Sequence, residues 1–281
     1  MMRHVSQEAI SELVRRLCLE ANLRLPPDVK AALQRAWQTE SFSTARWVLE
    51  QILRNAEIAD RQGLPLCQDT GLVFCFVRLG RDVKLGGDLE SAINEGVRAA
   101  YTSCALRASV LADPLRRDSN TGDNTPAITY VQITEGDTIE ITVAVKGGGS
   151  ENAGAVWMLT PATGPDEIIR MVAERVREQG GRWCPPGVIG VGVGGSMDRA
   201  ALLAKVALLR PLDKPHGEPA WANLEQRLLE SINATGVGPM GLGGTVTALG
   251  VHVEYQPCHM ASMPVAVAFD CHAARHATGV L

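Results

Sequence analysis

The hydrophobic pattern changes near residue 64, and this change limits the folds open to the chain. Residues 6–62 carry apolar side chains at helical spacing, for example Ile10, Leu13, Val14 and Leu17, which predicts helices with one buried face. From Leu64 onward, short apolar runs typical of strands alternate with helical segments and with loops rich in glycine and aspartate. We therefore predict an α/β (mixed α+β) fold, with an N-terminal helical segment followed by a mixed sheet with flanking helices and glycine-rich ligand loops.

The later elements can be placed by their periodicity. We expect strands at 72–77, 127–133, 138–145, 188–193, 245–254 and 264–269. We expect helices at 88–107, 166–179, 197–209 and 221–233. No internal repeat is visible. Residues 1–281 are expected to form a single domain, in which 1–62 is a helical N-terminal layer that packs without chemistry of its own.

Charge and hydropathy exclude two classes of partner. The chain has 27 Lys and Arg against 31 Asp and Glu, a net charge of −4, whereas a nucleic-acid-binding protein needs a cationic face. No apolar run reaches the roughly 18 to 20 residues of a membrane helix. The N-terminus has no apolar core after its basic residues, so no secretory signal is recognised. We expect a cytoplasmic protein with no nucleic-acid or membrane partner.

Three segments are rich in glycine and could bind a small anion. They are Lys146–Asn152, Gly190–Ser196 and Gly236–Thr245. Consecutive glycines can turn their N–H groups inward as an anion nest, and the second segment leads into a helix N-terminus. It also matches the dinucleotide pattern Gly190-x-Gly192-x-x-Gly195, with Asp213 near the distance of the acidic residue, so an NAD(P)-dependent dehydrogenase is an alternative.

The seven cysteines are widely and irregularly spaced, which argues against a disulfide framework in a chain without an export signal. Cys18 and Cys104 lie in helical patterns and Cys75 in a strand, so these three are expected to be buried as small apolar side chains. The sequence also has cysteines at the edges of loops, where a thiolate can face a cavity. They are Cys67, Cys184 and Cys271. Cys258 lies in a turn-like segment, so it fits either the buried cysteines or those at the edges of loops.

Three separated cysteines suit a metal centre that keeps one position open. Zinc sites more often use close pairs such as C-x-x-C, which are absent here. A cubane iron–sulfur cluster normally takes four thiolates. With three, one iron lacks a protein ligand and can act as a Lewis acid on a substrate. A metal-binding module without catalysis would use the same cysteines, so it is a second alternative.

Nine segments in chain order resemble one known family, the alpha subunit of the class I, iron–sulfur fumarate hydratases and L-tartrate dehydratases. In single-chain members the same region is the N-terminal domain. The segments are Cys67-Gln-Asp-Thr-Gly71, Leu106-Arg-Ala-Ser109, Asn120-Thr-Gly-Asp-Asn-Thr-Pro126, Lys146-Gly-Gly-Gly-Ser-Glu-Asn152, Cys184-Pro-Pro-Gly187, Gly194-Gly-Ser196, Gly241-Leu-Gly-Gly244, His259-x-Ala-Ser-x-Pro264 and Cys271-x-Ala-x-Arg275. The resemblance covers the chain from about residue 60 to its end.

The resemblance implies a [4Fe-4S] cluster and a set of ligands for it. The implied cluster ligands are Cys67, Cys184 and Cys271. Single-chain fumarases have Thr-His where this chain has Cys258-His259, so Cys258 remains an alternative third ligand. We favour Cys271 because the Ala-x-Arg pattern follows it.

The resemblance also implies a reaction, which is the reversible hydration of a C4 dicarboxylate. The first expectation for this reaction is the interconversion of fumarate and L-malate, and the second is the conversion of L-tartrate to oxaloacetate. Asp69 would be the general acid. The substrate contacts would be Gln68, Arg107, His259 and Gly149. The catalytic base lies in a second domain of single-chain relatives, so a separate beta subunit is expected to carry it, in an α2β2 hetero-oligomer.

Overall fold

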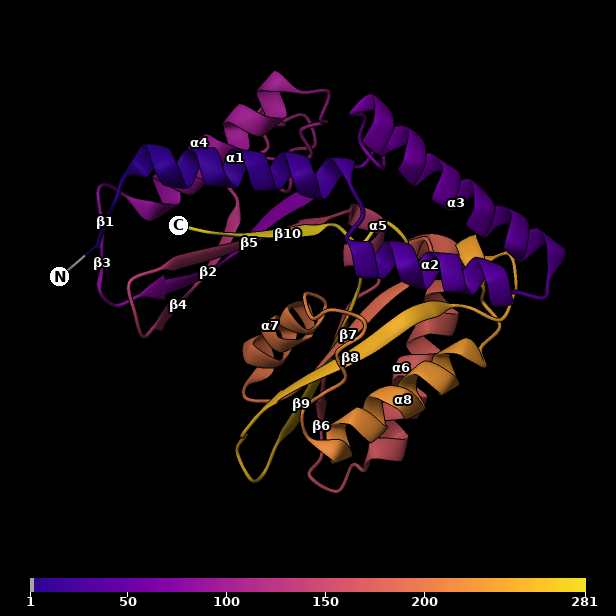
Figure 1. Cartoon of the computed structure of the whole chain (residues 1–281). Helices are drawn as coiled ribbons and strands as arrows, with labels where there is room; N and C mark the ends of the chain where they lie inside the picture. The colour runs from indigo at the N-terminus through magenta and orange to yellow at the C-terminus, as the bar shows by residue number, and fades with distance from the viewer. Residues whose placement is uncertain (1–2) are drawn as a thin grey trace. The chain divides into compact units, whose positions relative to one another are not determined.

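The computed structural model describes residues 3–281, and these form two compact units (Figure 1). Unit 1 consists of residues 3–26, 56–148 and 275–281. Unit 2 consists of residues 27–55 and 149–274. Helix α3 (Ser43–Gln62) contributes residues to both.

Unit 1 is built on a four-stranded mixed sheet in the order β10-β5-β2-β4. The strands are β2 (Leu72–Gly80), β4 (Ile128–Thr134), β5 (Ile139–Lys146) and β10 (His276–Val280). Strand β5 runs antiparallel to β2 and β10, whereas β2 and β4 are parallel. A two-stranded parallel ladder joins β1 (Arg3–Val5) to β3 (Val83–Leu85). The alternation along β5 buries Ile139, Ile141 and Val143, as expected for a strand with one face in the core.

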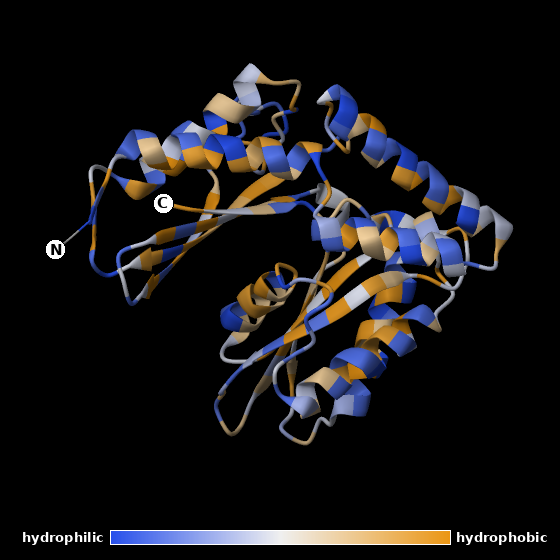
Figure 2. Cartoon of the chain, in the orientation of Figure 1, coloured by the Kyte–Doolittle hydropathy of each residue, from blue (hydrophilic) through white to orange (hydrophobic). Residues whose placement is uncertain are grey.

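Two helices cover the core face of this sheet. Helix α1 (Gln7–Leu23) is capped by Ser6, whose side chain accepts the N–H of Ala9, and it packs on β5, β10 and α4. Helix α4 (Leu89–Ser103) is capped in the same way by Asp88. Such side-chain caps satisfy N–H groups that the first turn leaves free. Figure 2 shows apolar and polar residues alternating along α1, which matches its one buried face.

Unit 2 contains a second four-stranded mixed sheet, in the order β6-β9-β7-β8. Its strands are β6 (Ala155–Leu159), β7 (Gly187–Gly194), β8 (Ala248–Gln256) and β9 (Met263–Phe269). Strands β7 and β8 are parallel, and β9 runs antiparallel to β6 and β7. The helices are α2 (Pro27–Thr39), α5 (Gly148–Asn152), α6 (Pro165–Gln179), α7 (Met197–Ala207) and α8 (Pro219–Asn233), with 3₁₀ turns at Gly180–Trp183 and Pro239–Gly241.

The first two glycines of the possible dinucleotide pattern, Gly190 and Gly192, lie inside β7 rather than in a loop, and the third, Gly195, directly follows the strand. Ile189, Val191 and Val193 share one core with α6 and α8. The alternate residues Gly190 and Gly192 face α7, and a Cβ built at Gly192 would lie 2.0 Å from the carbonyl oxygen of Ala200. These glycines therefore allow α7 to approach the strand closely. This packing accounts for the two glycines without a nucleotide.

The predicted α/β class and most elements are confirmed. Helices α1, α2 and α3 account for residues 7–62 apart from their connections, while Met1 and Met2 of the expected 1–62 layer lie outside the described residues. The helix expected at 88–107 is shorter, because α4 ends at Ser103 and Arg107 lies in a loop. No expectation was made for the short strands β1, β3, β6 and β10. Within residues 3–281, no helix is both long and apolar enough to cross a membrane.

Candidate functional site

Asp69 lies in a tight loop of unit 1, residues 67–71, immediately before β2. The N–H of Gly71 donates to Asp69 Oδ1 at 3.0 Å, and the N–H of Gly148 donates to Oδ2 at 2.7 Å. Gly71 has φ +62°, and a Cβ there would lie 2.4 Å from the carbonyl oxygen of Lys146, so only glycine fits this turn. The loop thus fixes the direction of the Asp69 carboxylate.

Arg107 lies beside this carboxylate, with Nη2 3.6 Å from Asp69 Oδ1. Its side chain is 62% exposed, so the ion pair is loose and contributes little stability. The guanidinium therefore has N–H groups that can bind a carboxylate in bidentate geometry. The structure brings together two of the residues expected from the sequence, Asp69 as the acid and Arg107 as a substrate contact.

Thr70 holds the backbone of Arg107 against the Asp69 loop. Its hydroxyl donates to the Arg107 carbonyl at 2.7 Å and accepts the Arg107 N–H at 2.9 Å. Thr70 is buried, and its own carbonyl accepts a hydrogen bond from the Tyr101 hydroxyl. Burial raises the pKa of Tyr101, so this phenol stays protonated as a donor.

Asn124 makes a second connection between the same two segments. Its amide nitrogen donates to the Gly71 carbonyl at 3.0 Å, and its Oδ1 accepts the Ser109 N–H at 2.7 Å. The residue is fully buried with φ +62°, a conformation that asparagine adopts more readily than most residues. Its motif was quoted for the resemblance, but sequence reasoning assigned Asn124 no role.

Arg275 supports the loop from the core of unit 1. It is 2% exposed and its Nη1 donates to the Asp69 carbonyl at 2.6 Å. Its Nε is buried and has no hydrogen-bond partner within residues 3–281. The residue was part of the Cys271-x-Ala-x-Arg275 motif, yet a contact that spans 206 residues of sequence has no local signal.

Cys67, in the same loop, is half-buried and carries polar neighbours. The Asp69 N–H points at its Sγ, 3.4 Å away, and the thiol lies 3.3 Å from Gln68 Oε1. Gln68 is exposed. An N–H directed at sulfur is a common feature around cluster-binding thiolates, whose potentials respond to such bonds.

Cys184 and Cys271, here called the cysteine pair, lie on adjacent backbone segments of unit 2. Cys184 follows the 3₁₀ turn Gly180–Trp183 and has φ +57°. Cys271 follows the end of β9. The His272 N–H donates to the Cys184 carbonyl at 3.1 Å. Both cysteines are half-buried, so each residue keeps some accessible surface.

The last two expected substrate contacts, Gly149 and His259, belong to unit 2. Gly149 is exposed in α5, and its Cα lies close to the Arg182 carbonyl, because a Cβ there would be 2.8 Å from that oxygen. His259 is exposed in the loop between β8 and β9, where its Nδ1 accepts the Ala261 N–H at 3.1 Å.

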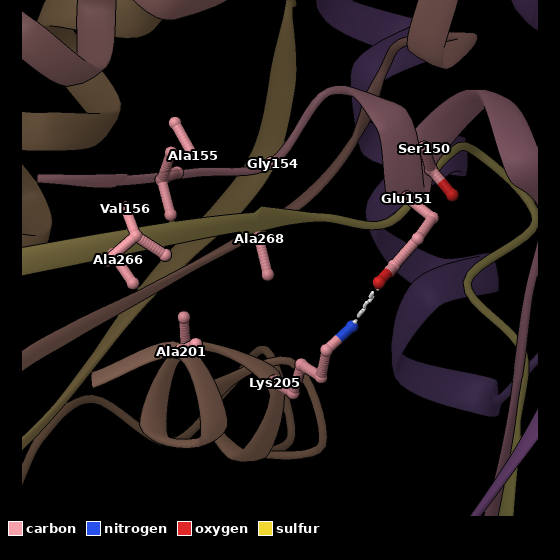
Figure 3. Close-up of a pocket in the computed structure, with 11 residues that line it drawn as sticks. Ser150, Glu151, Gly154, Ala155, Val156, Ala201, Lys205, Ala266 and Ala268 are labelled. Carbon is pink, nitrogen blue, oxygen red and sulfur yellow. Dashed lines mark hydrogen bonds and ion pairs between the residues drawn. The ribbon is translucent and has the colours of Figure 1, made fainter. Parts of the chain in front are cut away.

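An ion pair anchors helix α5, which carries Gly149. Lys205 Nζ of α7 lies 2.6 and 2.8 Å from the two carboxylate oxygens of Glu151 in α5 (Figure 3). The pair lies at one end of a cavity of about 220 Å³ that is otherwise lined mainly by alanines of β6, β9 and α7. The pair therefore connects the glycine-rich segment to α7.

The remaining cysteines have different surroundings. Cys18 and Cys75 are fully buried, as predicted, and burial raises the pKa of both thiols, to about 12 for Cys75. The same expectation was wrong for Cys104, which is exposed at the end of α4 because that helix stops at Ser103. Cys258 is exposed, and its thiol donates to the Ser262 carbonyl at 3.3 Å.

The donor set is compatible with an iron–sulfur cluster. The three expected ligands are the half-buried cysteines of the chain, whereas the fully buried thiols have raised pKa values that disfavour a thiolate. Cys67 belongs to unit 1 and the cysteine pair to unit 2. Within residues 3–281, no three His, Cys, Asp or Glu side chains surround a single point as ligands of one metal ion.

Comparison with known proteins places this geometry in a family. The family model described as fumarate hydratase (fumerase) matches residues 11–280. A protein of Methanocaldococcus jannaschii, provisionally named L(+)-tartrate dehydratase subunit alpha, is 42% identical over 275 residues, which is 95% of this chain and 96% of the relative. The L(+)-tartrate dehydratase subunit alpha of Escherichia coli K12 is 33% identical over 271 residues, 96% of this chain and 89% of the relative. The chain belongs to the class I fumarate hydratase (fumerase) family of hydro-lyases, with the tartrate dehydratase alpha subunits among its relatives.

Proposed function

We propose that this chain is the alpha subunit of a [4Fe-4S]-dependent hydro-lyase that reversibly adds water to a C4 dicarboxylate. The observation that carries the proposal is the pairing of Asp69 with Arg107 by Thr70 and Asn124, in a chain that belongs to this family. The arrangement offers a proton-exchanging carboxyl group and an anion binder side by side. Both are needed to remove a hydroxyl group from a hydroxy acid.

In this proposal the side chains of the chain bind and orient the substrate. Arg107 binds one substrate carboxylate, while Gln68, Gly149 and His259 make further polar contacts. Asp69, oriented by the N–H groups of Gly71 and Gly148, gives its proton to the departing hydroxyl group and takes it back in the hydration direction. Cys67, Cys184 and Cys271 would hold the cluster, which supplies a Lewis-acidic iron when bound.

The proposal includes a separate beta subunit, which would carry the base for the C–H proton. The named relatives are alpha subunits, which supports a two-subunit enzyme, and we propose an α2β2 assembly. Their names also favour L-tartrate, whereas the sequence led us to expect fumarate and L-malate first. We therefore propose L-tartrate as the first substrate to be tested.

The test is anaerobic purification of the chain together with the proposed beta subunit. The complex is offered L-tartrate, fumarate and L-malate separately, with iron per chain measured on the same sample. We expect iron in the complex and turnover of at least one of the three acids. A complex with full iron content and no turnover of any of them would favour a metal-binding module, and NAD(H)-dependent oxidation would favour the dehydrogenase.

A further inference from the structure

Glu40, in the connection between α2 and α3, is a carboxylate with no exposed surface. Its Oε1 accepts the Phe42 N–H at 3.0 Å, and its Oε2 accepts the Thr245 N–H at 2.8 Å and the Thr245 hydroxyl at 3.0 Å. Burial by itself raises the pKa of Glu40, but the backbone N–H groups of Phe42 and Thr245 outweigh burial and lower it. No role was expected for this residue, since residues 1–62 were predicted to pack without chemistry.

Glu40 ties the helical N-terminal segment to the third glycine-rich segment, Gly236–Thr245, across 205 residues of sequence. The sequence suggested that this segment could form an anion nest. In the structure an internal carboxylate accepts two donors at its C-terminal end. The segment therefore has a structural partner, which fixes its position.

The same glycine-rich segment touches the turn that carries Cys184. The Met240 N–H donates to the Pro185 carbonyl at 2.7 Å. Gly241 lies so close to the residues before Cys184 that a Cβ on it would be 2.6 Å from the Cα of Gly181. Contacts of this kind leave no room for the turn to shift independently of the glycine-rich segment.

A further hydrogen bond connects the Cys184 turn to the second cysteine of the pair. The Cys184 carbonyl accepts the His272 N–H, and His272 directly follows Cys271. All of these residues belong to unit 2. Cys184 also has φ +57°, a conformation that non-glycine residues keep only when their surroundings impose it.

We propose that Glu40 is a positioning residue that holds the cysteine pair in place by fixing the Gly236–Thr245 segment against the Cys184 turn. This rests on the proposed function insofar as the pair is taken to bind the cluster. The effect of Glu40 on the cysteine pair is transmitted from Thr245 through the backbone of that segment. Loss of the carboxylate would release Thr245, then Met240 from Pro185, and so free the Cys184 turn.

The test measures the alkylation rate of each thiol in the metal-stripped full-length chain, purified with its partner subunit, by mass spectrometry. Exposed Cys258 is the internal reference, and buried Cys18 and Cys75 report opening of unit 1. The variants are Glu40→Ala and Glu40→Gln, which keeps one oxygen acceptor. Leu33→Ala is the control, because Leu33 is a fully buried residue of α2 whose truncation lowers stability without removing a carboxylate.

We expect the Cys184 rate, relative to Cys258, to rise at least about fivefold in Glu40→Ala and by less in Glu40→Gln, and to stay within about twofold in Leu33→Ala. An unchanged ratio in Glu40→Ala, or an equal rise in Leu33→Ala, would overturn the proposal. Should Glu40→Ala fail to fold, which the fluorescence of the tryptophans of unit 2 would report, Glu40→Gln and Thr245→Val take its place. An unchanged ratio in both would then overturn the proposal.

Iron per chain, measured after anaerobic loading, separates this proposal from the proposed function. We expect Glu40→Ala to hold at most about half the iron of the unsubstituted chain, and Leu33→Ala to hold a normal amount. If the unsubstituted chain binds no iron at all, the proposed function fails. The thiol rates would still decide whether Glu40 positions the cysteine pair.

Discussion

At the scale of single residues, the carboxylate of Asp69 is held in a fixed direction. Two glycine N–H groups fix its oxygens, and Arg275 donates to its backbone carbonyl. Such fixed geometry is typical of a group that exchanges a proton at a defined point, because general acid–base catalysis requires the carboxyl group within hydrogen-bond reach of the reacting atom.

Replacing Asp69 by Asn keeps the shape of the side chain but removes the proton. We expect turnover of the alpha–beta complex to fall about 10²- to 10⁴-fold, while iron per chain stays normal. The matched control is Asp60→Asn, since Asp60 forms an exposed ion pair with Arg24 and should leave turnover unchanged. A loss of only a few-fold in Asp69→Asn would remove Asp69 as the acid.

The sequence suggested which side chains would carry the chemistry, but not which residues hold them in place. Asp69 and Arg107 were named because their motifs resemble those of the family, and the three cysteines because a thiolate at the edge of a loop can face a cavity. Thr70 and Asn124 act through contacts to backbone groups 37 and 53 residues away. No periodicity or local composition signals such a contact, so their roles became visible only in the folded chain.

At the scale of elements, strand β7 packs against helices on both of its faces. Its branched apolar residues face the core with α6 and α8, and its Gly190 and Gly192 face the backbone of α7. The sequence predicted the strand correctly, because the run is apolar and short. The sequence also matched a dinucleotide pattern there. Glycines in a strand and glycines in a phosphate-binding loop cannot be told apart by sequence alone, because the difference lies in the packing of the neighbouring helix.

Gly192→Ala tests this packing. The new Cβ would lie 2.0 Å from a backbone carbonyl of α7, and backbone cannot move aside cheaply, so the free energy of unfolding of unit 2 should fall by about 1–3 kcal/mol. Gly217→Ala is the control, because its Cβ would meet no atom within 4 Å and should change stability by less than about 0.5 kcal/mol. Urea unfolding measures both. Equal midpoints for the two variants would contradict the close-packing argument.

Strand β8 is joined to helix α8 by a buried polar cluster around His252. Arg210 contacts His252 Nδ1 at 3.0 Å, Glu254 at 2.8 Å, and also Glu225 of α8. Burial, reinforced by the neighbouring Arg210 charge, lowers the pKa of His252 to about 4. Glu225, Glu254 and Asp28 are the acidic groups around it, and their charges do not offset that effect.

This cluster predicts loss of stability in mild acid. Because the pKa of folded His252 lies below the ordinary value of 6.5, the unfolded chain binds the proton first as the pH falls. The neutral ring therefore contributes stability above about pH 6.5, and this is lost between pH 6.5 and about 4, by about 3 kcal/mol in all. In His252→Asn the stability should be lower at neutral pH and should vary less over this interval. A variant with the same slope as the unsubstituted chain would show that another group titrates.

At the scale of the whole molecule, the two units can be followed separately. All five tryptophans (Trp37, Trp47, Trp157, Trp183 and Trp221) belong to unit 2. Tryptophan fluorescence therefore reports the unfolding of unit 2 in the Gly192 and His252 experiments. The buried thiols Cys18 and Cys75 provide the corresponding probe in unit 1.

The distribution of cysteines over the molecule gives the last prediction. Replacing Cys67, Cys184 or Cys271 by Ser should each remove most of the iron and the brown cluster colour from the anaerobically purified complex, because a cluster with three protein thiolates cannot spare one. Cys104→Ser and Cys258→Ser are matched controls, since both residues are exposed, and both should keep normal iron. Normal iron in Cys271→Ser together with loss in Cys258→Ser would make Cys258 the third ligand. Normal iron after replacement of all three expected ligands would exclude the cluster assignment altogether, and with it the Lewis-acid chemistry proposed for this chain.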